Sequence, residues 1–100
     1  MSAFSQFSIA GDFDEKAAKK TIKNNDCGKC HAEKKTKKGP SYKKTAADYA
    51  GKADAYAKIS KHLREEPMVK LEDGTEEKHK AIEVENEAEL MNLVNYILAQ

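Results

Sequence analysis

Apolar residues recur every three or four positions in several stretches of this chain, and that spacing gathers them on one face of a helix. No stretch alternates apolar and polar residues over the length of a strand. The pattern therefore predicts an all-α fold. Helices are expected over residues 13–24, 42–49, 54–66 and 86–98.

Capping residues and turn formers mark the ends of these helices. Asn86 followed by Glu89 forms a capping box ahead of the last helix, and Asp12 followed by Glu15 does the same for the first. A proline ends the third helix, because it lacks the backbone N–H that a helix interior needs. The stretch over residues 67–85 is expected to be an irregular loop.

Length and composition limit what such a fold can be. The chain has 100 residues, of which 35% are charged and 39% hydrophobic, with no Trp. A chain so small and polar forms a single domain, expected over residues 12–100, and needs a metal, a disulfide or a prosthetic group to staple it. Residues 1–11 are expected to be a tail, either vector-derived or a processing remnant, and they lack the features of a secretory signal peptide. The longest apolar run is too short to span a membrane.

The formal net charge of +1 hides two segments of opposite charge. Residues 16–44 carry eleven lysines against two acids, whereas residues 65–89 carry ten acids against three lysines. The lysine-rich segment either only solubilises the protein or steers an acidic partner towards it. Nucleic acid is not an expected partner, because base recognition relies on arginine and this chain has only one.

Residues 27–31 read Cys-Gly-Lys-Cys-His, the spacing at which a c-type haem is attached. The thiols of Cys27 and Cys30 lie one helical turn apart, which suits thioether formation with the two vinyl groups at one edge of the porphyrin. The imidazole of His31 then binds the iron from the proximal side. The flat apolar macrocycle also supplies the interior that this polar chain cannot build from its own side chains.

Three other uses of these cysteines fit less well. A Cys-x-x-Cys redox pair belongs in a βαβ unit, and no strand is predicted. A zinc site needs four ligands, and the spacing of His31, His62 and His79 matches no zinc finger. A disulfide between cysteines three residues apart would staple almost nothing. The sequence therefore favours one covalently bound haem c, with its iron, as the cofactor.

The order of the motifs resembles that of small bacterial class I cytochromes c with one haem. After the haem motif, residues 39–42 read Gly-Pro-Ser-Tyr, and the last predicted helix ends in Leu-Val-Asn-Tyr-Ile-Leu. The resemblance implies three to five helices wrapped around one covalently attached haem, with the first and last helices crossing near Tyr96. It also implies that the Pro40 carbonyl accepts a hydrogen bond from His31 Nδ1, and that Tyr42 helps to bind the haem.

The second axial ligand is where this sequence departs from the family. The family usually supplies a methionine, next to a proline, from the loop before the last helix. Met68 follows Pro67 in the reverse order, whereas His79 stands close to where the family places its distal ligand. We expect His79 to be the ligand, with Met68 as the alternative. Met91 is expected in the core of the last helix, and His62 is expected to be solvated or hydrogen-bonded.

These features predict an outer-sphere one-electron carrier rather than an enzyme, monomeric and located in the periplasm, where maturation of this family is expected. A second imidazole on the iron lowers the reduction potential relative to a thioether, so a low potential is expected. The alternative function is a haem-based sensor or gas-binding module whose distal ligand detaches on reduction. Acidic redox partners are expected to dock at a Lys-rich haem edge made by Lys34, Lys35, Lys37, Lys38, Lys43 and Lys44.

Overall fold

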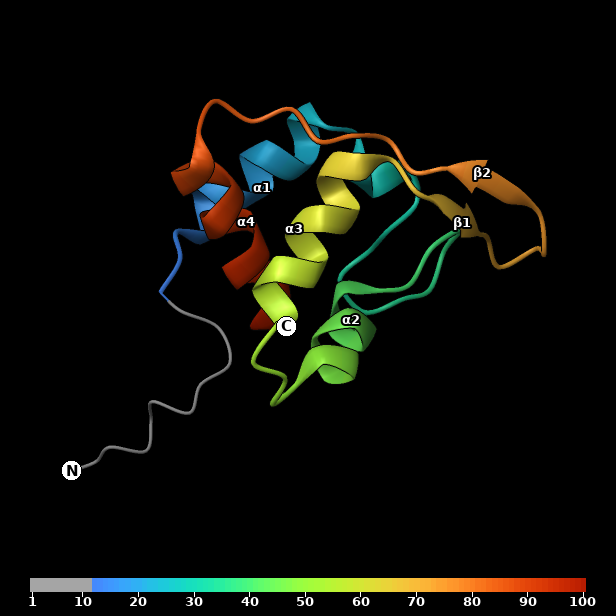
Figure 1. Cartoon of the computed structure of the whole chain (residues 1–100), viewed down its shortest axis with the longest axis horizontal. Helices are drawn as coiled ribbons and strands as arrows, with labels where there is room; N and C mark the ends of the chain where they lie inside the picture. The colour runs from blue at the N-terminus through green and yellow to red at the C-terminus, as the bar shows by residue number, and fades with distance from the viewer. Residues whose placement is uncertain (1–11) are drawn as a thin grey trace.

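The first and last helices cross and pack against each other in the computed structural model, which describes residues 12–100 (Figure 1). The helical elements are α1 (Glu15–Asn24), the short 3₁₀ turn η2 (Cys27–Lys29), α2 (Tyr42–Tyr49), α3 (Ala55–Glu65) and α4 (Glu87–Leu98). Helix α4 packs against α1, α2 and α3, so it is the common neighbour of the other helices. The expected tail, residues 1–11, lies outside the described residues. No helix within residues 12–100 is long and apolar enough to cross a bilayer.

The helix boundaries follow the capping side chains. Asn86 caps α4 as predicted, because its Oδ1 accepts a hydrogen bond from the backbone N–H of Glu89 at 2.9 Å. Helix α1 begins later than predicted, because Asp14 rather than Asp12 is its cap and accepts from the N–H of Ala17 at 3.0 Å. Helix α2 has the predicted bounds, and α3 is one residue shorter at each end.

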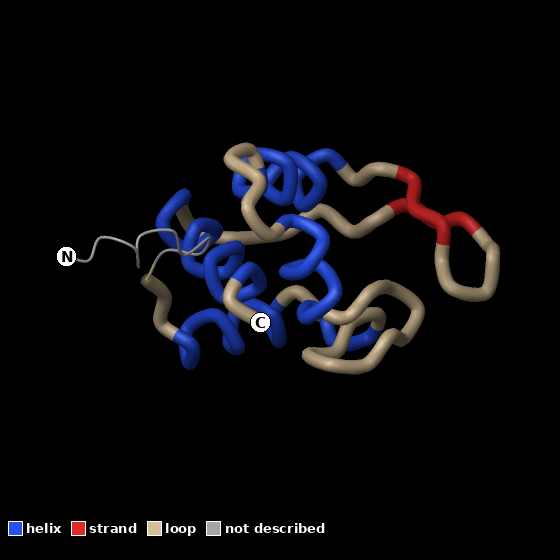
Figure 2. Tube along the Cα trace, turned by 90° about the horizontal axis from the view of Figure 1, so that it is seen from below, coloured by secondary structure: helices blue, strands red, loops and turns tan. Residues whose placement is uncertain are grey.

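The expected irregular loop after α3 contains a small antiparallel sheet, so the prediction that no strand forms is wrong here. Strand β1 (Met68–Lys70) pairs with β2 (Glu76–Lys78), and Gly74 makes the turn with a φ of 89°, which favours glycine. The strands are short and mostly exposed, so neither carries the alternating apolar face that a sequence pattern could reveal. The hairpin of β1, β2 and their turn projects from the helices (Figure 2).

Helix α4 supplies side chains to both buried clusters of the core. Leu93, Tyr96 and Ile97 pack with side chains of α1 and α2, whereas Leu90, Val94 and Leu98 pack with side chains of α3. The apolar stripe predicted for this helix is therefore confirmed. The placement of Met91 in the core is wrong, because Met91 is 47% exposed.

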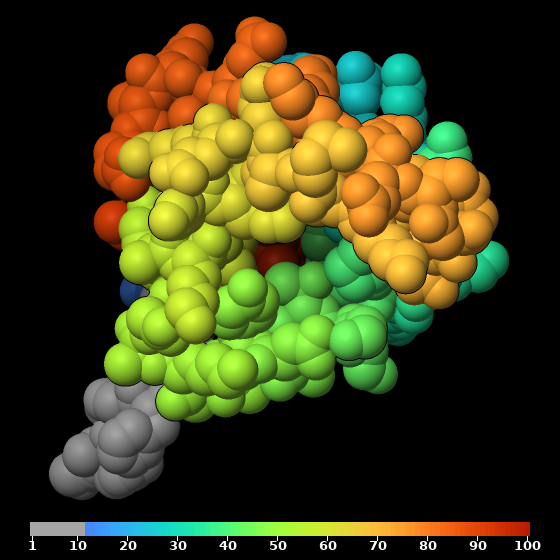
Figure 3. Space-filling view, turned by 45° about the vertical axis from the view of Figure 1, so that its right-hand side comes forward, coloured from blue at the N-terminus to red at the C-terminus, as the bar shows by residue number. Residues whose placement is uncertain are grey.

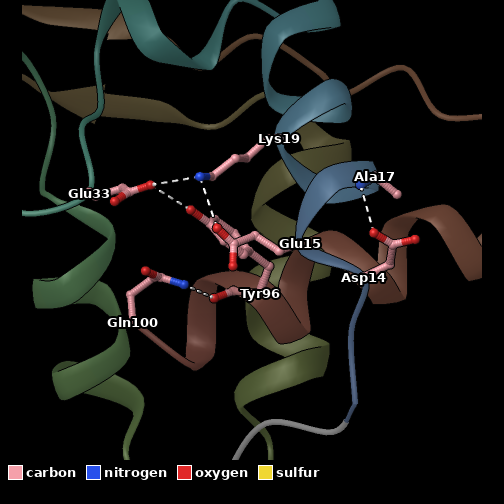
Figure 4. Close-up of polar contacts among 7 residues, drawn as sticks. All are labelled: Asp14, Glu15, Ala17, Lys19, Glu33, Tyr96 and Gln100. Atoms are coloured by element: carbon pink, nitrogen blue, oxygen red, sulfur yellow. Dashed lines mark hydrogen bonds and ion pairs between the residues drawn. The ribbon is translucent and has the colours of Figure 1, made fainter.

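The helix crossing is tied to the loop after the haem motif by a polar cluster (Figure 4). The hydroxyl of Tyr96 on α4 donates to Oε2 of Glu33 at 2.8 Å. Lys19 on α1 contacts the carboxylates of Glu15 at 2.9 Å and Glu33 at 3.9 Å. Burial and the bond to Glu33 raise the pKa of Tyr96 to about 12, so the hydroxyl remains a donor across the neutral range.

Truncation of a buried side chain of α4 should lower the free energy of unfolding far more than truncation of an exposed one. We expect Leu90→Ala to lower the free energy of unfolding by about 2–5 kcal/mol, because it leaves a cavity at a fully buried position. Met91→Ala is the matched control on the same helix, and it should change the free energy by less than about 0.5 kcal/mol. Guanidinium unfolding followed by far-UV circular dichroism measures both. Equal losses would contradict this assignment of buried and exposed faces.

Candidate functional site

A cavity of about 540 Å³ lies between α2, α3, α4 and the hairpin. Figure 3 shows its mouth between α3 (yellow), the hairpin (orange) and the α2 region (green), with atoms of the last helix (dark red) at the bottom. The structure brings all six residues predicted to hold the cofactor to the lining of this one cavity: Cys27, Cys30, His31, Pro40, Tyr42 and His79. The rest of the lining includes the apolar side chains of Ile22, Ile59, Leu63, Ile82, Leu93 and Ile97.

The two thiols lie on one wall of the cavity, held by a single helical turn. Asp26, in a left-handed conformation with φ of 57°, turns the chain out of α1 and into η2. The carbonyl of Cys27 then accepts hydrogen bonds from the N–H groups of Cys30 at 3.1 Å and His31 at 2.9 Å. Both cysteines are free and half-buried, and burial raises the pKa of the Cys27 thiol. The turn therefore presents two thiols and an imidazole to the same space.

His31 is held by two contacts that the family resemblance partly implies. Its Nδ1 lies 2.6 Å from the Pro40 carbonyl and donates to it, and its ring stacks on Tyr42 with ring centres 5.7 Å apart. Burial lowers the pKa of His31, although the Pro40 carbonyl acts in the opposite direction. A neutral ring that donates through Nδ1 keeps the lone pair of Nε2 available for a metal ion.

Gly39 supports His31 in a way that the sequence did not reveal, beyond its place in a turn. A Cβ at this position would lie 2.7 Å from Cε1 and 3.2 Å from Nδ1 of His31. The backbone can therefore approach the imidazole this closely only without a side chain. The N–H of Gly39 also donates to the Cys30 carbonyl at 2.8 Å, which closes the loop against the haem motif.

His79 faces His31 from the hairpin side of the cavity. The two ring centres are 6.2 Å apart, with the ring planes inclined at 41°. The N–H of His79 donates to the Pro67 carbonyl at 2.8 Å, and its Nδ1 donates to the Lys80 carbonyl at 2.9 Å. The second of these bonds leaves the Nε2 lone pair of His79 free, as the Pro40 bond does for His31.

Neither methionine considered as a distal ligand reaches the cavity. The side chain of Met68, the predicted alternative, is 62% exposed on β1 and does not line it. Met91 on α4 is also exposed and does not line the cavity. The next residue of strand β1, the partly buried Val69, does line the cavity.

His62 was expected to be solvated or hydrogen-bonded; it is exposed, yet it also lines the cavity. Its ring meets that of His79 edge-on, with ring centres 4.6 Å apart and planes at 72°. Burial and the neighbouring imidazoles lower the pKa of His62. Sequence reasoning missed this pair because the two histidines come together only through the path of the hairpin.

Asn25, the C-cap residue that ends α1, also supports the site. It is 5% exposed, and its side-chain amide forms two hydrogen bonds with the backbone of Glu83, here called the Asn25 clamp. Its Nδ2 donates to the Glu83 carbonyl at 3.1 Å, and its Oδ1 accepts from the Glu83 N–H at 2.7 Å. The clamp joins the residues just before the haem motif to the segment that follows the hairpin.

The lining residues fit a covalently attached haem. Two imidazoles that bind one metal ion from opposite sides, each with a bond of about 2 Å, have ring centres roughly 6 Å apart, close to the 6.2 Å between His31 and His79. The hydroxyl of Tyr42 is buried, and within residues 12–100 it has no hydrogen-bond partner. A bound group with an acceptor oxygen would satisfy it. Thiols, facing imidazoles and apolar walls together match what a porphyrin requires.

The fold and this site define a class I c-type cytochrome, and comparison with known proteins agrees. A family profile described as cytochrome c matches residues 15–100, so the chain belongs to the cytochrome c family. Its cofactor is one covalently bound haem c with its iron, and it is a monohaem electron carrier.

Among solved structures, the chain is similar to the class 1 cytochrome MtoD from Sideroxydans lithotrophicus ES-1, with 45% sequence identity and a TM-score of 0.84. The match covers 88% of this chain and 97% of MtoD. No curated protein sequence matches the chain significantly.

Gly28 in the haem motif and Gly39 in the turn that follows it offer a matched test of how His31 is held. Gly39→Ala should displace the imidazole and lower the free energy of unfolding by about 1–3 kcal/mol, because the new methyl group has no room. Gly28→Ala should be neutral, since no atom lies within 4 Å of its Cβ position. Unfolding midpoints and the ferric spectrum of the haem-loaded variants check both. Similar behaviour of the two variants would disprove the role given to Gly39.

Proposed function

We propose that this protein is a low-potential, outer-sphere electron carrier between periplasmic redox partners. Cys27 and Cys30 hold the haem by thioether bonds, and His31 and His79 are its two axial ligands. The observation that supports this most directly is the pair of facing imidazoles, 6.2 Å apart between ring centres. Thioether attachment in this family also supports maturation, and therefore function, outside the cytoplasm.

The bound haem supplies one-electron chemistry between the ferric and ferrous states of its iron. The residues of the chain hold that centre rather than react with a substrate. His31 and His79 occupy both axial positions, and the bond from His31 to the Pro40 carbonyl makes the imidazole a stronger electron donor. Apolar side chains such as Leu93 and Ile97 keep water from the centre. A rigid environment without water needs little reorganisation energy when the iron gains an electron, and electron transfer is therefore fast.

The gas-binding alternative requires His79 to leave, and the structure gives reasons to favour the carrier. Two backbone hydrogen bonds join the segment that contains His79 to the end of α3 and to Pro67 just after it. The His79 N–H donates to the Pro67 carbonyl and the Ile82 N–H donates to the Leu63 carbonyl, each at 2.8 Å. These bonds support His79 as the resident ligand in both oxidation states of the iron.

The proposed ligand pair predicts the effect of replacing His79. His79→Met should raise the reduction potential by about 0.1–0.3 V, a fraction of the roughly 0.8 V that axial ligands span, because a thioether favours the ferrous state. The near-infrared band of sulfur ligation should appear in the ferric variant and be absent from the wild type. Potentiometric titration and ferric spectra measure the two effects.

Met68→Leu is the matched control for that experiment. It should leave both the potential and the spectrum unchanged, because the Met68 side chain is exposed and outside the cavity. A wild-type protein that already shows the sulfur band, and loses it in Met68→Leu, would refute the assignment of His79.

The docking surface proposed for acidic partners gains residues that the sequence analysis missed. Four lysines line the cavity itself, and Lys29 and Lys70 among them have no carboxylate within 4.0 Å in residues 12–100. The other two are paired: Lys78 with Glu66 and Lys80 with Asp26, each at 3.7 Å. The six lysines predicted from the sequence are exposed and do not line the cavity. Lys29 and Lys70 therefore border the proposed haem site without a carboxylate partner in the described residues.

Electron transfer to an acidic partner should fall as ionic strength rises, because salt screens the attraction that orients the complex. Lys29→Glu or Lys70→Glu should slow the reaction by roughly two- to tenfold at low salt. Lys16→Glu is the matched control, since it makes the same charge change on the exposed face of α1. Stopped-flow rates with an acidic redox protein measure these effects. A rate that ignores both salt and the rim variants would remove the proposed docking surface.

A further inference from the structure

The cavity contains two histidines on the side opposite His31, although one metal ion needs only one distal ligand. His79 faces His31, and His62 meets His79 edge-on at 4.6 Å between ring centres. The imidazole of His62 lines the cavity beside the position that His79 occupies.

Backbone hydrogen bonds keep these two histidines side by side. The chain leaves α3 at Pro67, makes the hairpin and returns along the end of the same helix. The return segment is bonded to α3 and to the residue just after it through the Leu63 and Pro67 carbonyls, each at 2.8 Å. His62 directly precedes the anchor at Leu63 on α3, and His79 lies at the Pro67 anchor on the return segment. Their proximity is thus a property of the fold rather than of one side-chain rotamer.

His62 lies on a well-packed helix, whereas His79 follows an exposed strand. His62 belongs to α3, whose Ala55 and Ile59 are buried in the core with α4. His79 comes directly after β2, and all three residues of that strand are exposed. Few buried contacts hold the hairpin, so it is the element that moves first when a partner or solvent fluctuation acts on this side. His62 keeps its place when His79 is drawn away.

We propose that His62 is a second distal ligand, which binds the haem iron in place of His79 whenever the hairpin carries His79 out of the cavity. The exchange breaks one nitrogen–iron bond and forms another, with no change in the oxidation state of the iron. The ring of His62 already borders the volume that the ring of His79 vacates. This inference rests on the proposed function, because it assumes an attached haem with two axial imidazoles.

The exchange preserves electron transfer and suppresses gas binding. The centre keeps two nitrogen ligands during motions of the hairpin, so it does not open to CO, NO or O₂ for long. A single distal histidine on so exposed a hairpin would leave the sixth position empty each time it moved. The second histidine thus explains how a loosely packed hairpin can serve a carrier.

Three haem-loaded variants test the proposal: His79→Ala, His62→Ala and the double variant. Electron paramagnetic resonance of the ferric proteins reports whether two imidazoles are bound. We expect both single variants to remain low-spin with two imidazole ligands, and the double variant to become high-spin. Lys61→Ala, an exposed neighbour of His62 that does not line the cavity, is the matched control and should behave as the wild type.

Carbon monoxide binding to the reduced proteins gives a second readout. The double variant should bind CO rapidly. His79→Ala should bind it at least about tenfold more slowly, since a competing ligand with an advantage of about 1.4 kcal/mol has that effect. Added imidazole should restore the low-spin spectrum of the double variant, which shows that this variant is folded and lacks only its ligand.

The outcomes separate this inference from the proposed function. A high-spin His79→Ala protein, together with a low-spin wild type that has two imidazole ligands, would overturn the role of His62 and leave the proposed function intact. If His62→Ala is high-spin while His79→Ala is low-spin, His62 is the resident ligand. That result would overturn both the role of His62 as a replacement ligand and the assignment of His79. A wild type without attached haem would refute the proposed function itself.

Discussion

The hydrogen bond from His31 Nδ1 to the Pro40 carbonyl is the constraint on which the site depends. It selects the tautomer of the imidazole, directs the remaining nitrogen into the cavity and shapes the loop between the haem motif and α2. Gly39 makes the bond possible because the backbone passes where a methyl group would collide with the ring. Tyr42, at the start of α2, stacks on the same imidazole. Three neighbouring features of one short loop therefore orient a single side chain.

Helix α4 joins this local arrangement to the stability of the whole domain. The same helix that holds both buried clusters together also supplies Leu93 and Ile97 to the bottom of the cavity. The apolar walls that the haem needs are thus continuous with the core that folds the chain. For so small and polar a protein, the cofactor and the core form one apolar interior rather than two separate ones.

The sequence predicted what short-range patterns encode. The haem motif, the Gly-Pro turn and the stripe of α4 depend on spacings within a few residues, and all three are present in the structure. It did not predict the hairpin, because strands of three mostly exposed residues are too short to carry a periodic signal. It also missed the His62–His79 contact and the Asn25 clamp, whose partner Glu83 is 58 residues away along the chain. Pairings of that kind depend on the path of the chain, which no local pattern records.

The exposure of Met68 has a chemical consequence for a protein that handles electrons. Peroxide and related oxidants convert methionine to its sulfoxide, and accessible side chains react first. In a cytochrome whose iron is bound by a thioether, that reaction destroys a ligand. Here the reactive sulfur faces solvent on β1, far from coordination, and the iron is proposed to be held by nitrogen alone. Oxidative damage at Met68 would therefore alter the polarity of the surface and leave the redox centre as it was.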